Sequence, residues 1–182
     1  DFLGIEIEQF TTQHCGCNCV FCFVHQLPDD MRKSLYVKDE DYRLSFLEGA
    51  YITGMNLKDS DLERIARMRL SPLYLSVHAI DEDVRRYLLG IKKCRPFMEL
   101  LDFFSEHRIM MHSQIVLCPG LNDGAELERT LGTMLEYYPT VQSVAIEDGE
   151  AIIRLTGTLS LGGVCDAPRV RAQLEETAQQ YA

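Results

Sequence analysis

The sequence contains no apolar run that approaches the roughly 20 residues a membrane-spanning helix needs. Its first residues, Asp1-Phe2-Leu3-Gly4, also lack the basic region and apolar stretch that open a secretory signal. These two absences argue against the membrane and secreted classes and predict a cytoplasmic protein. The initiator Met is missing as well, which indicates a fragment or an excised domain unless processing has removed that residue.

Positive charge is scarce, because 18 Lys and Arg residues stand against 28 Asp and Glu residues for a formal net charge of -10. A surface of this charge offers no broad electrostatic hold for phosphate backbones, which disfavours nucleic acid as a partner. The chain also has no internal repeat, low-complexity tract or obvious linker. Its 182 residues and 46% hydrophobic fraction predict one ordinary domain with a real core.

Short apolar runs alternate with helix-period segments from residue 4 to residue 146, as in βα units around a parallel sheet. This pattern predicts an α/β fold with parallel strands and outer helices. The expected strands are Gly4–Glu8, Tyr51–Met55, Leu73–Ala79, Met110–Cys118 and Val141–Ile146. The expected helix signals are the capping pairs Ser60 with Glu63 and Asp123 with Glu126, a cap at Asp81, a stop at Gly90 and a first-turn Pro96.

After Glu147 the βα rhythm weakens. Segments 151–155 and 158–161 predict a hairpin, and the apolar spacing from 170 to 181 predicts a final helix. We therefore divide the chain into a core at residues 1–146 and a divergent tail at residues 147–182 that packs on the core.

Cysteine, in contrast, is concentrated at one place. Four of the seven Cys residues lie between positions 15 and 22, too close together for an ordinary disulfide framework, so they predict metal ligands in a reducing compartment. Cys15, Cys19 and Cys22 have the spacing C-x3-C-x2-C, and three thiolates hold an iron-sulfur cubane while leaving its fourth iron open to another ligand. Cys17 leaves a second interpretation, in which all four thiols hold a structural zinc ion.

The cysteine segment is similar to the motif of the radical S-adenosylmethionine superfamily, in which an aromatic residue often precedes the last Cys, as Phe21 does here. Further strings resemble a subgroup of bacterial proteins whose radical core lies between an N-terminal PDZ-like domain and a C-terminal domain of unknown function. The PDZ-like part is absent from this sequence. The resemblance covers residues 3 to 145 and includes the strings Phe21–Pro28, Met31–Tyr36, Asp41–Leu47 and Val116–Gly124.

The resemblance implies a partial (β/α) barrel with its chemistry at the carboxyl ends of the strands. A full barrel of this superfamily has six strands, so the five expected here imply a shortened barrel or a further strand within residues 66–71.

The resemblance also implies a [4Fe-4S] cluster on Cys15, Cys19 and Cys22, whose open iron binds S-adenosylmethionine. Reductive cleavage of this cofactor would give a 5'-deoxyadenosyl radical that abstracts hydrogen from an unknown substrate, with flavodoxin or ferredoxin as the external electron donor. The alternative is a non-catalytic iron-sulfur or structural zinc protein, a truncated relic of the enzyme.

Further cofactor contacts are implied besides Phe21. Gly54 occupies the place of a glycine-rich turn beside the cofactor's amino group, although any tight turn needs a small residue and the usual acidic residue is missing here. Ser76 and His78 alternate on the third expected strand, so they share the face directed into the barrel, either near the cofactor or as satisfied polar groups. Asn122 contacts the cofactor from a loop or only caps a helix.

Other polar residues carry weaker hypotheses. His112 and Gln114 alternate on the fourth expected strand and are candidate substrate contacts. The charged run Lys38–Arg43 is typical of a solvated face, while its nearness to the cysteines leaves a substrate or lid role open. Cys17 is expected to point away from the cluster.

Overall fold

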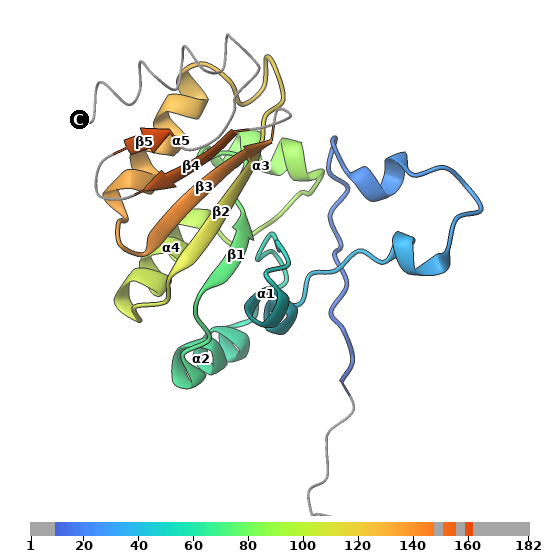
Figure 1. Cartoon of the computed structure of the whole chain (residues 1–182), viewed down its shortest axis with the longest axis horizontal. Coiled ribbons are helices and arrows are strands. Elements are labelled where there is room, and N and C mark those ends of the chain that lie inside the picture. The colour runs from blue at the N-terminus through green and yellow to red at the C-terminus, as the bar shows by residue number, and fades with distance from the viewer. Residues whose placement is uncertain (1–9, 148–150, 156–158, 162–182) are drawn as a thin grey trace, which may run out of the picture.

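The computed structural model describes residues 10–147, 151–155 and 159–161. The first expected strand, at 4–8, and the final expected helix, at 170–181, lie outside these residues. The described strands form one five-stranded sheet in the order β1-β2-β3-β4-β5. As Figure 1 shows, the parallel strands are followed by an antiparallel pair; the strands are β1 (Leu73–Ser76), β2 (Met111–Val116), β3 (Val141–Glu147), β4 (Ala151–Leu155) and β5 (Leu159–Leu161).

Helices fill the connections between the parallel strands. The helices α3 (Glu82–Leu89) and α4 (Phe97–Glu106) connect β1 to β2, and α5 (Ala125–Glu136) connects β2 to β3. The expected α/β class, a partial barrel of parallel strands with outer helices, is therefore confirmed. No described helix is both long and apolar enough to cross a bilayer. The elements before β1 are η1 (Phe23–Gln26) and η2 (Lys33–Tyr36), which are short 3-10 helices, then α1 (Tyr42–Glu48) and α2 (Asp59–Met68).

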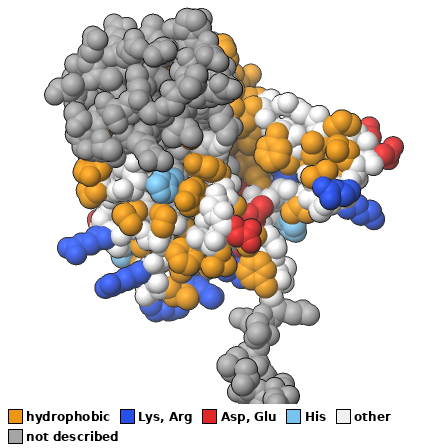
Figure 2. Space-filling view, viewed as in Figure 1, with side chains coloured by type: hydrophobic (Ala, Val, Ile, Leu, Met, Phe, Trp, Pro, Cys, Tyr) orange, Lys and Arg blue, Asp and Glu red, His pale blue; other side chains and the backbone are white. Residues whose placement is uncertain are grey.

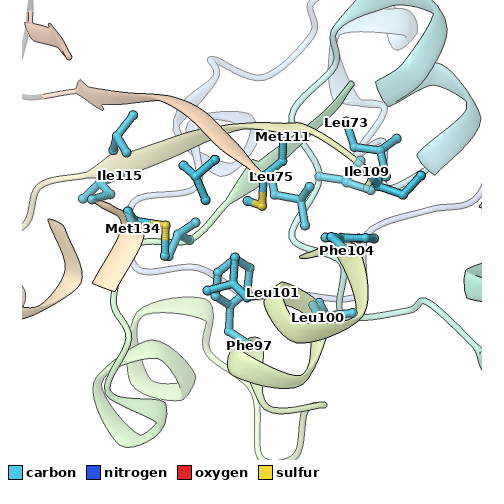
Figure 3. Close-up of a cluster of buried hydrophobic side chains, with 14 of the residues drawn as sticks. Leu73, Leu75, Phe97, Leu100, Leu101, Phe104, Ile109, Met111, Ile115 and Met134 are labelled. Atoms are coloured by element: carbon cyan, nitrogen blue, oxygen red, sulfur yellow. The ribbon is translucent and has the colours of Figure 1, made fainter. Parts of the chain in front are cut away.

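Successive residues of β2 point to opposite faces of the sheet. Met111, Ser113 and Ile115 are buried, whereas His112 and Gln114 are only partly buried on the other face. Burying one large apolar side chain contributes about 1.5–3 kcal/mol, so packing on the apolar face stabilises the sheet against its helices. The other face, which carries His112 and Gln114, is available for a site. Figure 3 shows the side chains of α4 and α5 that pack on the apolar face, among them Phe97, Leu100, Leu101, Phe104 and Met134.

The expected second strand, Tyr51–Met55, is reduced to a single bridge on the edge of β1. The Ile52 N–H donates to the Tyr74 carbonyl at 3.0 Å, and the Ile52 carbonyl accepts from the Ser76 N–H at 2.7 Å. The chain then turns at Gly54, where φ is +73°. The strand is thus correctly placed, but its predicted length is wrong because this turn ends the extended backbone.

The helix α2 differs from its expectation at both ends. Its N-cap N–H donates to the Asp61 carboxylate at 3.0 Å, so the expected capping box of Ser60 with Glu63 is wrong because the helix begins before Ser60. At the other end Arg69 adopts a left-handed conformation with φ +51°. Residues 66–71 therefore form a helix end and a turn and hold no further strand.

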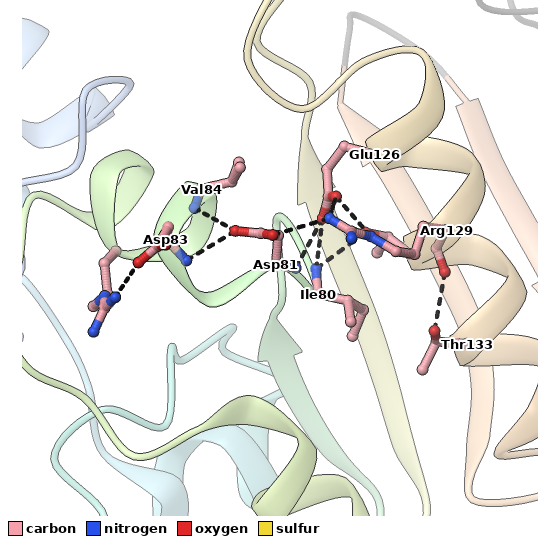
Figure 4. Close-up of polar contacts among 9 residues, drawn as sticks. Ile80, Asp81, Asp83, Val84, Glu126, Arg129 and Thr133 are labelled. Carbon is pink, nitrogen blue, oxygen red and sulfur yellow. Dashed lines mark hydrogen bonds and ion pairs between the residues drawn. The ribbon is translucent and has the colours of Figure 1, made fainter.

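Asp81 caps α3 as expected, because its carboxylate accepts from two N–H groups of the first turn at 2.9 and 3.0 Å. The expected capping pair of Asp123 with Glu126 at α5 is wrong. Glu126 instead reaches across to accept from the N–H groups of Ile80 at 3.0 Å and Asp81 at 2.9 Å, as Figure 4 shows. Arg129 joins both carboxylates, so α5 is tied to the connection between β1 and α3.

The hairpin expected within residues 151–161 is confirmed. The strands β4 and β5 pair in antiparallel order, and β4 also pairs with β3. The hairpin therefore extends the core sheet. The division of the chain at residue 147 stays a prediction.

Candidate functional site

The cysteine segment forms a loop that lies against the carboxyl end of α3, near the top of Figure 1. The Asn18 N–H donates to the Leu89 carbonyl at 2.9 Å, and the Val20 N–H donates to the Leu88 carbonyl at 3.0 Å. Carbonyls in the last turn of a helix have no partner within the helix itself. The loop thus supplies hydrogen-bond donors to the last carbonyls of α3, and the same bonds hold the loop against the helix.

Gly90 allows this close approach. It has φ +63°, and a Cβ built on it would lie 2.1 Å from the Asn18 carbonyl oxygen. A backbone atom cannot move aside as a flexible side chain does, so any other residue at this position would displace either the end of α3 or the loop.

The charged run holds the other side of the loop. The Cys15 N–H donates to the Lys38 carbonyl at 2.9 Å, and His14 forms an antiparallel bridge with Asp39. The Lys38 ammonium donates to the Cys17 carbonyl at 2.5 Å. The loop is therefore clamped between α3 and a segment that comes some 20 residues later in the chain.

The three motif thiols, Cys15, Cys19 and Cys22, are half-buried. The hydrogen bond with Cys17, together with burial, raises the pKa of Cys15, whereas the hydrogen bond from Cys17 lowers the pKa of Cys19 despite burial. Among the described residues no group of three His, Cys, Asp or Glu side chains converges as a metal site would. The donor chemistry nevertheless fits an iron-sulfur cluster, since three thiols lie on one clamped loop.

Cys17 differs from its neighbours because it is buried, with 3% of its surface exposed. Its sulfur lies 3.8 Å from the Thr53 hydroxyl, on the wall behind the loop. The hydrogen bond with Cys15 lowers its pKa, but the hydrogen bond with Cys19 and burial outweigh that effect and raise the pKa to about 11. The expectation that Cys17 points away from a cluster stays a prediction.

A cavity of about 380 Å³ lies beside the loop. It is lined by Cys15 and Cys22, by Ser76 at the end of β1 and by Gln114 within β2. The Ser76 hydroxyl donates to the Gln114 amide oxygen at 3.3 Å. The structure therefore brings two of the three motif cysteines together with the polar face of the sheet.

Ser76 and His78 do not share the face expected for them. The strand β1 ends at Ser76, and His78 has φ +66°, so the two side chains do not continue one strand pattern. Ser76 lines the cavity, whereas His78 is buried and accepts from the Val116 N–H at 3.1 Å. Burial, and more weakly the charge of Arg85, lowers the pKa of His78 to about 3. Phe21 lies against this neutral ring, with 4.6 Å between the ring centroids.

Asn122 is fully buried and joins the ends of two strands. Its amide nitrogen donates to the carbonyls of His78 at 2.8 Å and Val116 at 3.0 Å, and its oxygen accepts from the Cys118 N–H at 2.7 Å. The structure thus gives Asn122 a positioning role. Its cofactor contact stays a prediction.

Gly54 and His112 have packing roles of their own. A Cβ on Gly54 would come within 3.1 Å of the Leu100 side chain, in addition to the positive φ that favours glycine there. His112 lies on the polar face of β2 with its Nδ1 2.7 Å from the Ser143 hydroxyl. Their contacts with a cofactor or substrate stay predictions.

Two residues of the charged run are buried although the sequence predicts a solvated face. Glu40 and Asp41 are 2% and 0% exposed, so the expectation of a solvated face is wrong for both. Asp41 caps α1 and pairs with Arg43 at 2.5 Å. Glu40 lines the cavity and accepts from the Thr53 hydroxyl at 2.6 Å. The signal in the sequence that could have placed Glu40 near the site is its nearness to the cysteines.

Arg85 is a second residue that sequence reasoning missed. It is fully buried, and its guanidinium donates to the Val77 carbonyl at 3.0 Å and the Thr53 carbonyl at 2.9 Å while lying over the Phe97 ring. Burial lowers its pKa. The signal was its position, since Arg85 precedes Leu88 and Leu89 by three and four residues, on the apolar side of α3.

Comparison with known proteins identifies the family of this chain. A crystal structure of Streptococcus suis SuiB is similar with a TM-score of 0.45 and 20% identity, over 72% of this chain and 28% of that one. This chain therefore spans less than a third of that structure's length. No curated protein matches the sequence. The model of one family, described as the radical SAM-like domain, matches residues 1–144. Because this match covers most of the chain, the chain belongs to the family of radical SAM-like domains, within the radical S-adenosylmethionine superfamily.

Proposed function

We propose that the protein is a radical S-adenosylmethionine enzyme whose cluster is held by Cys15, Cys19 and Cys22. The observation that carries this proposal is the cavity that Cys15 and Cys22 line together with Ser76 and Gln114. When bound, a [4Fe-4S] cluster and S-adenosylmethionine would supply reductive cleavage to a 5'-deoxyadenosyl radical for hydrogen abstraction from a substrate.

The chain's own residues would position this chemistry. The clamp between α3 and the charged run fixes the backbone of the loop that carries the thiols. Ser76, at the carboxyl end of β1, and Gln114, in the second half of β2, offer hydrogen-bonding groups near the strand ends where ligands of such folds bind.

The surface next to the cysteines suits a redox partner. Phe23 and Val20 are 74% and 52% exposed, and Met31 and Val37 are exposed as well. Figure 2 shows apolar side chains gathered over the segment that carries η1 and η2, with both basic and acidic side chains at its edge. Exposed apolar groups of this kind mark interaction surfaces. We propose that the external electron donor, flavodoxin or ferredoxin, docks here.

A structural zinc protein is the second candidate, because Cys17 supplies a fourth thiol on the same loop.

Anaerobic reconstitution separates the two candidates. The enzyme proposal expects about four iron and four sulfide per chain, and 5'-deoxyadenosine after addition of dithionite and S-adenosylmethionine. Stoichiometric zinc without sulfide would establish the second candidate. Chromatography of the reaction mixture then reports whether the loaded cluster cleaves its cofactor.

A further inference from the structure

Lys38 contacts the cysteine loop with both its backbone and its side chain. Its carbonyl accepts from the Cys15 N–H at 2.9 Å, and its ammonium donates to the Cys17 carbonyl at 2.5 Å. The side chain is half-buried and lines the cavity together with Cys15 and Cys22. The charge of Lys38 is therefore held beside the loop that carries the motif thiols.

No carboxylate pairs with this ammonium within the part of the chain that the structure describes. Besides the Cys17 carbonyl, its polar contact is the His25 ring, whose Nε2 lies 3.3 Å from the Lys38 Nζ. A charge at a half-buried position is screened less by water and salt than a charge on the open surface. The field of the ammonium therefore extends into the cavity.

The wall of the cavity carries opposite charges at neighbouring positions. Lys38 is the one cationic side chain among the described residues that line it, whereas Asp39 and Glu40 are acidic. Glu40 is 2% exposed and accepts from the neutral Thr53 hydroxyl at 2.6 Å. Because charges of both signs lie on one wall, an electrostatic effect on the site can be recognised by its sign.

An iron-sulfur cluster becomes one unit more negative when it accepts an electron, so the net charge around it helps to set its reduction potential. We propose that the Lys38 ammonium raises the reduction potential of the cluster held by the three motif cysteines. The inference rests on the proposed function, which places a cluster there. The electron comes from the external donor, and no bond forms or breaks. Lys38 acts through the cluster, so it is a positioning residue and not a catalytic one.

Redox titration monitored by electron paramagnetic resonance measures this potential in the anaerobically reconstituted protein, without S-adenosylmethionine. Lys38→Gln and Lys38→Met remove the positive charge, Lys38→Arg keeps it, and Glu40→Gln removes a negative charge from the same wall. The control is Lys58→Gln, because Lys58 is exposed and is not among the described residues that line the cavity. Iron and sulfide analysis of every variant checks that the cluster is loaded.

Loss of the positive charge should lower the midpoint potential. At a fixed solution potential, Lys38→Gln and Lys38→Met should decrease the ratio of reduced to oxidised cluster by about tenfold, the effect of one partly screened unit charge. Lys38→Arg and Lys58→Gln should keep the wild-type midpoint, and Glu40→Gln should raise it. A merely structural disturbance of the wall would instead move the Lys38 and Glu40 variants in the same direction, because both would admit water to the cluster.

The possible failures are distinguishable. If the wild-type protein loads no iron and sulfide, the proposed function fails and this inference fails with it. If the wild type loads its cluster, but the loaded Lys38 variants keep its midpoint or shift in the same direction as Glu40→Gln, only the role of Lys38 is overturned. If neither Lys38→Gln nor Lys38→Met loads, the ammonium is required to assemble the loop, and the electrostatic role is overturned as well.

Discussion

At the scale of single residues, the thiols of the three motif cysteines and of Cys17 differ in burial and are expected to differ in role. Cys15, Cys19 and Cys22 are half-buried, while Cys17 is enclosed against Thr53. We expect Cys15→Ala, Cys19→Ala and Cys22→Ala each to abolish the cluster, because two thiolates do not hold a cubane. Cys17→Ala should load iron and sulfide normally. Iron and sulfide analysis with the visible absorption spectrum measures this, and loss of iron in Cys17→Ala alone would contradict it.

Gly90 gives a second test at this scale. Gly90→Ala should destabilise the protein by more than the roughly 1–2 kcal/mol cost of a left-handed alanine, because the new Cβ also meets the Asn18 carbonyl. Gly120→Ala is the matched control, since Gly120 has φ +80° and no atom near its added Cβ. Urea unfolding compares the two variants. Equal losses of stability would show that the loop does not press on Gly90.

His78 predicts a pH dependence. Its folded-state pKa is about 3 against an ordinary value of 6.5, so below 6.5 the unfolded chain binds a proton that the folded chain refuses. Stability should therefore be full above pH 6.5 and fall as pH decreases, by about 1.4 kcal/mol per unit from this residue alone. His78→Gln should flatten the fall between pH 6.5 and 5.5 in denaturant titrations. An unchanged slope in His78→Gln would contradict a buried neutral imidazole.

At the scale of elements, the sequence predicted what depends on periodicity and missed what depends on long-range contacts. The apolar alternation at Met111 and Ile115 correctly placed β2, and Asp81 correctly marked the start of α3. Glu126 has the spacing of a cap, yet it binds N–H groups some 45 residues away. No local pattern encodes such a partner, because local spacing carries no information about chain crossings.

The same reasoning explains the candidate site. The spacing of Cys15, Cys19 and Cys22 and the placement of Ser76 were accessible from sequence, since each follows from a local motif or strand. Glu40 was not, because a charged residue in a charged run looks exposed until the tertiary fold encloses it.

Arg85 connects three parts of the fold, namely α3, the end of β1 and the segment at Thr53. Its guanidinium binds the ends of β1 and of the segment at Thr53 from a position on α3. Arg85→Met keeps the apolar volume but removes the donor to the Thr53 carbonyl and one of the two donors to the Val77 carbonyl, so we expect a loss of about 2 kcal/mol or more. The exposed Arg86→Met on the same helix should change stability by less than about 0.5 kcal/mol. Urea unfolding of both variants is the measurement, and equal stabilities would contradict a bridging role.

At the scale of the whole molecule, the site and the sheet edge are separable. The cavity is lined by residues between Cys15 and Gln114, all of which precede β3. The hairpin of β4 and β5 lies on the far side of β3, where its pairing covers a strand edge. Chemistry should therefore depend on the first part of the chain, and stability on both.

A chain ended at Glu147 tests this separation. It keeps the three motif cysteines and the residues that line the cavity, so its reduced cluster should cleave S-adenosylmethionine to 5'-deoxyadenosine and methionine without any substrate, at a rate per loaded cluster close to that of the full chain. It also leaves β3 as an unpaired edge, which lowers stability and promotes association. A chain ended at Leu161 is the control, because it retains the hairpin. Chromatography of the products and the urea midpoint of each version separate the two effects. A truncated protein that loads iron fully and binds the cofactor, yet forms no 5'-deoxyadenosine while the full chain does, would show that the tail takes part in the chemistry.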